Sequence, residues 1–171
     1  MALVVHASNP IAGLSAEEVR SIFTGRVSDW SGVGGRERKI VVVHKADGRS
    51  TQEVFLGHFR LAPGQVRPSA VIGDNAQGIK TIAGSPGAIG YISIGAVERS
   101  AREGEPVRTV WIDGIPATTE SLRNGNYPIA RDLVLVTRGE ASPAAEAFIE
   151  FTRSARADRY INGFSFVQAD E

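Results

Sequence analysis

The sequence of 171 residues contains no cysteine. Disulfide bonds, thiolate nucleophiles and cysteine-ligated zinc or iron–sulfur centres are therefore excluded, although the compartment is not fixed by this absence. The histidines His6, His44 and His58 stand at no metal-ligand spacing, so we expect no metal site. A Gly-x-Ser-x-Gly nucleophile motif is also missing, and we expect neither an enzyme nor a cofactor.

The chain also lacks an excess of charge of either sign, since nineteen basic residues balance nineteen acidic ones. A balanced surface without basic runs argues against a nucleic-acid partner and against binding to a charged membrane surface. The N-terminal stretch MALVVHASNP has no basic region followed by a long apolar segment. It therefore predicts neither a signal peptide nor membrane insertion.

Strand and helix patterns alternate along the whole chain. The hydrophobic content of 42% is enough for one ordinary core, so we expect a single domain over 1–171. The strands are expected over 3–6, 40–43, 88–94, 107–112 and 133–137. The helices are expected to be capped by Ser15, by Asp47 or Ser50, by Asn75, by Thr118 or Thr119 and by Ser142. This pattern predicts an α/β fold with a mixed central sheet flanked by helices, in which Trp30 is a buried anchor.

The most informative stretch is 40–55, where a β-branched strand meets a helix. The first N–H groups of that helix have no acceptor within it, and they lie at the positive end of the helix dipole. An oxyanion at this turn would meet these donors together with hydroxyls and cations. The candidate ligand-binding residues are Lys45, Asp47, Gly48, Arg49, Ser50 and Thr51.

The same turn has a simpler interpretation. Asp47 or Ser50 can cap the helix with its side-chain oxygen, while Lys45 and Arg49 remain solvated cations. Strand-to-helix turns are common in α/β folds, so the pattern alone leaves both interpretations open.

Six motifs occur in an order that resembles a known family. They are SNPIAGLSAEEVRSIFTG, VSDWSGVGG, IVVVHKADGRST, SPGAIGYISIG, IDGIPATTESLRNGNYPIAR and AFIEFTRSARADRYINGFSFV. In sequence and in order they resemble the periplasmic phosphate-binding proteins of ABC transporters. The resemblance implies one lobe of a two-lobed periplasmic-binding-protein-like fold, with 1–125 as the second lobe and 126–171 as the segment that returns to the first. The segment 124–128 is then expected to be the former hinge, extended and relatively exposed.

The resemblance also covers the central turn. The family carries an arginine, two further positions and then Gly-Ser-Gly-Thr at the helix start. Asp47, Gly48 and Thr51 fit this pattern. Lys45 stands where the family has its phosphate-gripping arginine, Arg49 where it has a serine, and Ser50 where it has a glycine. Lysine supplies charge without the bidentate fork of arginine. Arg49 either restores that cation or fills the pocket with its bulk.

The implied function is that of a non-enzymatic solute-binding module. Its ligand would be phosphate or a similar oxyanion, its partner an ABC transporter permease, and its location periplasmic or extracellular. The alternative is an orphan lobe kept as a structural or protein-interaction domain, with a degraded anion site. Direct measurement of ligand binding distinguishes the two.

The return segment 126–171 presents a packing problem. Its expected strand 133–137 and the helix after Ser142, with Ala147, Phe148 and Phe151 inward, pack in the family against strands that this chain does not encode. Two outcomes are open: the segment folds back onto the sheet of the same chain, or it pairs with a second copy. We favour the homodimer, because an unpaired β-branched edge is a template for strand pairing.

Overall fold

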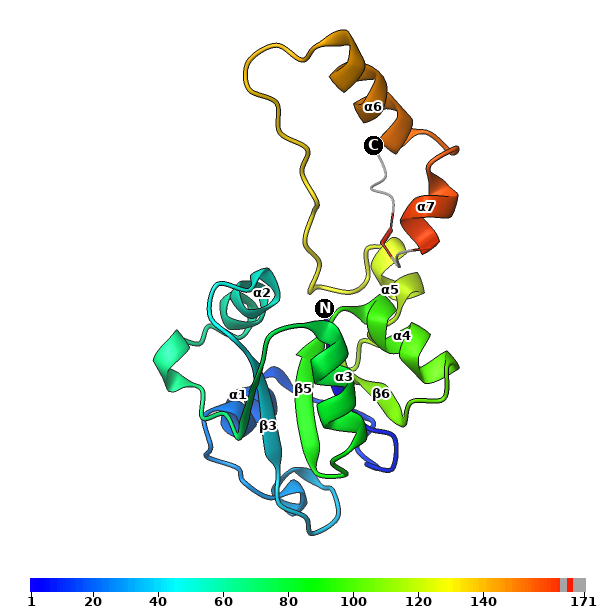
Figure 1. Ribbon diagram of the computed structural model, residues 1–171. Coiled ribbons are helices and arrows are strands. Elements are labelled where there is room, and N and C mark those ends of the chain that lie inside the picture. The colour runs from blue at the N-terminus through cyan, green and yellow to red at the C-terminus, as the bar shows by residue number, and fades with distance from the viewer. Residues whose placement is uncertain (164–165, 168–171) are drawn as a thin grey trace.

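The computed structural model describes residues 1–163, 166 and 167 (Figure 1). Its sheet has six strands: β1 Ala2–His6, β2 Gly13–Leu14, β3 Val41–Lys45, β4 Ala70–Ile72, β5 Ala88–Ile92 and β6 Val107–Ile112. The strand order is β2-β6-β1-β5-β3-β4. β3 runs parallel to both β4 and β5, and β1 runs antiparallel to β5 and β6. The prediction of an α/β fold with a mixed central sheet is confirmed.

Helices cover both faces of this sheet (Figure 1). The helices of the lobe are α1 Ala16–Phe23, α2 Ser50–Phe59, α3 Asn75–Ala83, α4 Ile94–Arg102 and α5 Thr119–Arg123, with short 3-10 turns at Trp30–Val33 and Pro63–Gln65. Two more, α6 Pro143–Arg153 and α7 Asp158–Gly163, follow in the C-terminal segment. Side chains alternate along each strand, so β1 directs Leu3 and Val5 into the core beneath α1 and α2. Val4 points the other way, into the core beneath α3 and α4.

Several local predictions are confirmed. Ser15 caps α1 in a full capping box with Glu18, and the helix buries the apolar face that its spacing predicted. Trp30 is buried, and its indole Nε1 donates a hydrogen bond of 3.0 Å to the carbonyl of Gly87. Thr118 caps α5. The two caps depend on nearby sequence, which is why the pattern was sufficient to find them, whereas the Trp30 bond joins residues 57 positions apart.

Other boundaries differ from the prediction. Asp74, and not Asn75, caps α3, because the Asp74 carboxylate accepts a hydrogen bond of 2.8 Å from the Gln77 backbone. The strand expected over 88–94 ends at Ile92, and α4 begins at Ile94. Because Asp74 caps α3, the Asn75 side chain is free to make other hydrogen bonds.

The chain leaves this lobe later than expected. Asn126 is exposed, but Tyr127 and Ile129 are only 3% and 1% exposed. The prediction that 124–128 would be exposed is therefore wrong for Tyr127, whose ring has packed into the main core. The Met1 ammonium donates to the Ile129 carbonyl at 3.0 Å, which places the first residue beside the point of departure.

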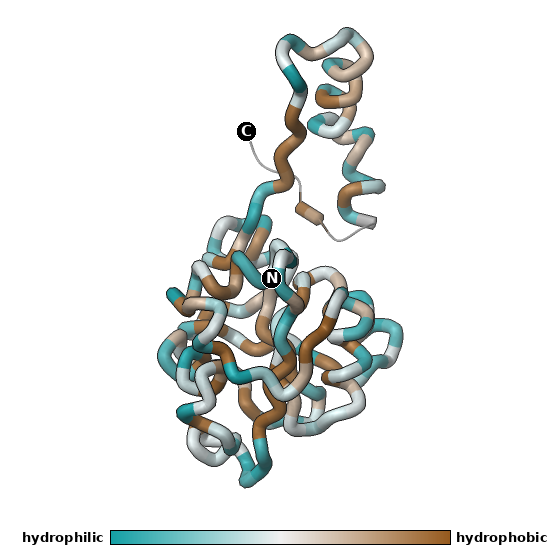
Figure 2. The backbone as a smooth tube through the Cα atoms, turned by 60° about the vertical axis from the view of Figure 1, so that its left-hand side comes forward, coloured by the Kyte–Doolittle hydropathy of each residue, from teal (hydrophilic) through white to brown (hydrophobic). Residues whose placement is uncertain are grey.

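Residues 130–163 form a return arm that projects away from the lobe (Figure 1). The predicted strand 133–137 is wrong, because no other strand pairs with it among the described residues. Ser142 does cap α6, but α6 buries no residue. Ala147 and Phe148 are exposed and Phe151 is half-buried, so the prediction that they point inward is also wrong. The arm does not fold back onto the sheet, and its apolar residues 133–136 lie along an extended segment (Figure 2).

Candidate functional site

Three strand-to-helix turns meet at one edge of the sheet. β3, β4 and β5 are parallel, so their carboxyl ends share this edge, and each is followed by the N-terminus of a helix. α2 packs on one face of the sheet, whereas α3 and α4 pack on the other. The turns therefore diverge at a topological switch point, which is where open α/β sheets bind ligands.

The β3–α2 turn holds the candidate residues 45–51. Gly48 has φ of 75°, the left-handed conformation that glycine adopts without strain. Arg49 is the N-cap of α2 and its side chain makes no capping bond. The prediction that Asp47 or Ser50 caps the helix is therefore wrong. Asp47 instead accepts a hydrogen bond of 2.8 Å from the Gln52 amide, and Ser50 is already the first helical residue.

The backbone donors of this turn are free within the described part of the chain. The N–H groups of Gly48 to Thr51 donate to no described acceptor, whereas the next one, of Gln52, donates to the Arg49 carbonyl at 2.8 Å. Ser50 is exposed and Thr51 is half-buried. The turn thus offers N–H donors, two hydroxyls and a positive helix end to an anion.

Lys45 is the buried cation of the site. Its side chain is 3% exposed, and its ammonium donates to Oδ1 of Asn75 at 2.9 Å. Among the described residues it forms no ion pair. Burial lowers the pKa of Lys45 below its ordinary 10.5, and the nearby Arg49 lowers it further while Asp74 opposes the shift. A buried charge with a neutral partner is costly, and a bound anion would compensate it.

Asn75 connects Lys45 to the third turn. Its amide Nδ2 donates a hydrogen bond of 2.9 Å to Oγ of Ser93, the N-cap of α4. The chain Lys45–Asn75–Ser93 thus joins all three turns. The sequence interpretation assigned no ligand role to Asn75 or Ser93. The signal available was their position, because each stands at a helix start within three residues of the end of a strand.

A second polar chain supports the turn from below. The Lys45 backbone donates to the Tyr91 hydroxyl at 3.2 Å, and that hydroxyl lies 2.9 Å from Nδ1 of His44. Nε2 of His44 in turn lies 3.3 Å from the Gln52 amide nitrogen. Burial lowers the pKa of His44 and raises that of Tyr91, so both stay neutral near neutral pH. Phe55 of α2 stacks on the Tyr91 ring with 4.1 Å between centroids, which ties the helix to β5.

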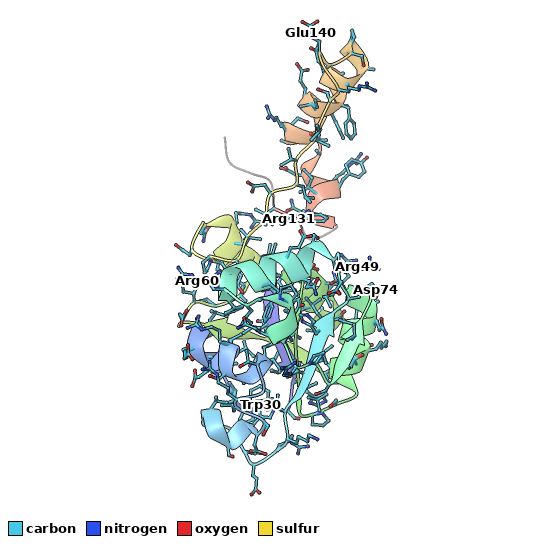
Figure 3. The ribbon with its side chains drawn as sticks, turned by 90° about the vertical axis from the view of Figure 1, so that its left-hand side faces the viewer. Trp30, Arg49, Arg60, Asp74, Arg131 and Glu140 are labelled. Carbon is cyan, nitrogen blue, oxygen red and sulfur yellow. The ribbon has the colours of Figure 1, made fainter. Side chains whose placement is uncertain are left out.

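Arg49 lies on the outside of the site. Its side chain is exposed, and its Nη2 is 3.8 Å from the position that a Cβ on Gly73 would take. Figure 3 shows Arg49 beside Asp74, at the N-terminal end of α2. The guanidinium therefore reaches across from the β3–α2 turn to the β4–α3 turn.

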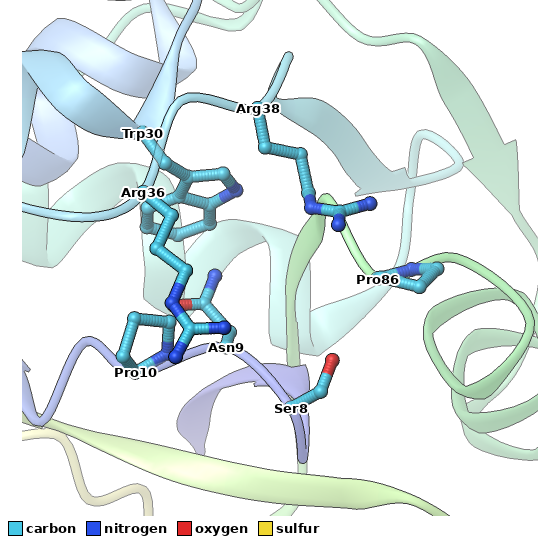
Figure 4. A pocket seen from close by; sticks show the side chains of 7 residues that line it. All are labelled: Ser8, Asn9, Pro10, Trp30, Arg36, Arg38 and Pro86. Carbon is cyan, nitrogen blue, oxygen red and sulfur yellow. The ribbon is translucent and has the colours of Figure 1, made fainter.

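Two cavities lie on this lobe. One of about 410 Å³ borders the candidate turn and is lined by 44–47 and by Pro63, Val66 and Pro68. The other, of about 180 Å³, includes Arg36, Arg38 and Ser8 among its lining residues (Figure 4). No group of three acidic, histidine or cysteine side chains in the described residues could hold a metal ion. None of the described helices combines the length and apolar character that a bilayer crossing requires.

Comparison with known proteins decides the family. The profile described as "PBP superfamily domain" matches residues 1–156. The chain belongs to this superfamily. It is 31% identical over 152 residues to the phosphate-binding protein PstS of Bacillus subtilis (strain 168), covering 86% of this chain and 48% of that protein. The chain thus spans about half the length of this curated relative.

Solved structures agree with this assignment to the PBP superfamily. One, described as a phosphate ABC transporter substrate-binding protein with bound phosphate from Clostridium perfringens, matches at TM-score 0.85 with 26% identity. The match covers 99% of this chain and 68% of that one, so it includes the return arm. A second, an ABC-type phosphate transport receptor from Vibrio cholerae, matches at TM-score 0.79 with 25% identity over 98% of this chain and 69% of that one. The resemblance seen in the sequence motifs is confirmed, and none of these relatives is described as an enzyme.

Proposed function

We propose that this chain binds phosphate, or a similar oxyanion, where α2, α3 and α4 begin. The observation that carries the proposal is Lys45, a buried cation whose described partner is the neutral amide of Asn75. The free backbone donors of the neighbouring turn support it independently. An anion here compensates a buried charge and accepts hydrogen bonds that the fold leaves unused.

The candidate residues take distinct parts in this proposal. Backbone N–H groups of Gly48, Arg49 and Ser50, with the backbone and hydroxyl of Thr51, donate to the oxyanion. Lys45 supplies charge from beneath. Arg49 adds a second cation from the rim, where solvent screens it. Asp47 holds the turn in place through Gln52, without contacting the anion itself.

The same proposal places the chain in transport. Phosphate held by hydrogen bonds and charge alone is released unchanged, so the role is that of a non-enzymatic solute-binding module. We expect an ABC transporter permease as its partner, because both structural relatives are described as ABC-type phosphate transport proteins. A periplasmic or extracellular location is what the resemblance of the sequence motifs implies. The match leaves about a third of the Clostridium perfringens structure without a counterpart in this chain. This lobe alone is therefore expected to bind weakly, with one side of the ligand in water.

The affinity for phosphate is expected to depend on the charge of Lys45. The charged form is required, so binding is present below the Lys45 pKa and is lost as the pH rises through it. Burial places that pKa below 10.5. Arginine stays charged beyond pH ~12, so Lys45→Arg is expected to hold its affinity over the same range. Calorimetric titration with phosphate, from about pH 8 upward, measures both proteins, with Arg36→Ala as a control that behaves as wild type.

Two results would contradict this proposal in different ways. If wild type gives no heat with phosphate at any pH, the chain has no phosphate site of measurable affinity, which favours the interaction-domain alternative. If wild type and Lys45→Arg weaken in parallel with pH, the titrating cation is not Lys45.

The return arm supports a second role, association through its apolar face. Its exposed large apolar residues are Leu133, Val134, Leu135 and Val136, which are 65%, 75%, 54% and 86% exposed, together with Phe148 and Tyr160 at 56% and 49%. A strand with both faces apolar is typical of the interior of a sheet. We propose that, where no further segment of a longer protein covers it, the arm pairs with a second copy of this chain.

Self-association is expected to depend on Val136. Wild type should change from one chain to two over a tenfold rise in concentration, as light scattering after size exclusion measures. Val136→Lys places a charge in the paired strand and is expected to weaken the dimer tenfold or more, whereas Thr137→Lys, directed to the other side, should have a smaller effect. A mass of one chain at every concentration would rule out the homodimer.

A further inference from the structure

We propose that Asn75 is the positioning residue that keeps this site selective for anions, by holding Lys45 with a neutral oxygen where a carboxylate would cancel its charge. This inference rests on the proposed function and deepens it. Asn75 touches the cation on which the site depends, yet it stands thirty positions further along the chain, at the start of a different helix.

The contact with Lys45 is not a by-product of helix capping. Asp74 caps α3 through the Gln77 backbone, so the Asn75 side chain is not needed to begin that helix. Its two polar atoms are both engaged elsewhere: Oδ1 accepts from Lys45 and Nδ2 donates to Ser93, each at 2.9 Å. The Asn75 amide therefore links the three turns at this edge of the sheet by hydrogen bonds to Lys45 and Ser93.

The direction of these hydrogen bonds orients the amide. An ammonium has only donors, so it requires Oδ1 of Asn75 and excludes the NH₂ group from the same place. Nδ2 then faces Ser93, whose oxygen accepts this hydrogen bond and whose own hydroxyl proton donates to no acceptor among the described residues. Donors thus point outward from both ends of the chain Lys45–Asn75–Ser93, an arrangement that suits an oxyanion.

Aspartate at this position would neutralise the charge of Lys45 with almost no change in side-chain shape. The carboxylate of Asn75→Asp would meet Lys45 at the same place and form a buried ion pair. An arriving anion would then encounter a neutral pair and the free oxygen of an acid. The natural residue, an uncharged acceptor of the same size, holds the lysine without satisfying its charge.

The test compares Asn75→Asp with Ala76→Asp, which adds the same charge one position along at an exposed residue. Calorimetric titration with inorganic phosphate is expected to show at least a tenfold loss of affinity for Asn75→Asp and less than a threefold loss for Ala76→Asp. The unfolding midpoint of Asn75→Asp without phosphate should equal or exceed that of wild type, because the new ion pair is satisfied. A merely structural role predicts the opposite, a lower midpoint with affinity kept.

A second readout does not require phosphate binding. The pKa of Lys45, followed by NMR of its side chain, should rise in Asn75→Asp and stay at the wild-type value in Ala76→Asp. Equal affinity and equal Lys45 pKa in Asn75→Asp and wild type would overturn the inference. If wild type binds no phosphate while the pKa rises as expected, the proposed function fails and the role of Asn75 in setting the charge of Lys45 stands.

Discussion

Replacing Lys45 with methionine is expected to lower the affinity for phosphate about a hundredfold, a loss of ~2.7 kcal/mol. Hydrogen bonds to charged groups contribute roughly 1.5 to 3 kcal/mol each. The bond that the Lys45 ammonium would donate to phosphate is shielded from water, because Lys45 is 3% exposed. Methionine keeps the apolar stem of the side chain while removing the ammonium. Calorimetric titration of both proteins with phosphate measures the difference.

The same substitution is expected to stabilise the protein in the absence of phosphate, by about 1 kcal/mol. The folded state no longer buries a cation whose partner is neutral, and the Asn75 amide can still bond Ser93. A pH series distinguishes this cause from general repacking. Wild type binds fewer protons folded than unfolded between its lowered Lys45 pKa and 10.5, so its stability rises with pH in that window. Lys45→Met lacks this rise.

Urea unfolding at several pH values checks the stability prediction. Lys45→Gln is a suitable control, because it removes the charge while keeping a donor for Asn75. A Lys45→Met protein that binds phosphate as wild type does, or that loses stability at every pH, would show that Lys45 serves the fold and not the ligand.

Truncating Phe55 to alanine is expected to cost about 3 to 5 kcal/mol of unfolding free energy. The ring is fully buried, and its centroid lies 4.1 Å from Tyr91, 4.5 Å from Phe23 and 4.9 Å from Phe59. Its removal leaves a cavity between α1, α2 and β5 that rigid neighbours fill only in part. Urea unfolding monitored by circular dichroism measures the loss.

The neighbouring exposed residue gives the matched control for this core substitution. Glu53→Ala lies on the outer side of the same helix, and a change within about 0.5 kcal/mol is expected. A Phe55→Ala loss no larger than that of Glu53→Ala would mean that the aromatic cluster does not hold α2 on the sheet.

Sequence patterns predicted the elements of the lobe because their causes are local. The apolar spacing of α1 and its Ser15 cap, and the β-branched run before the turn at Asp47, are each contained in a few consecutive residues. The capping of α2 was predicted wrongly for the opposite reason. Asp47 has a competing donor in Gln52, and a propensity for capping does not reveal which partner prevails.

Only part of the candidate site could be predicted from sequence patterns. The turn at 45–51 stands out in the sequence, but the contact of Lys45 with Asn75 joins residues thirty positions apart and depends on how β3, β4 and β5 align. The prediction of a strand in the return arm was wrong for a related reason. A run such as 133–136 becomes a strand only when another strand pairs with it, and no described residue of this chain does so.

The most direct test of the central claim is a crystal structure with arsenate, an oxyanion of phosphate geometry whose arsenic is located by anomalous scattering. We expect the arsenic beside the start of α2, with arsenate oxygens in hydrogen-bonding distance of Lys45 Nζ and of the backbone nitrogens of Ser50 and Thr51. Arsenate bound instead between Arg36 and Arg38, or ordered arsenate absent from the edge formed by α2, α3 and α4, would contradict the account.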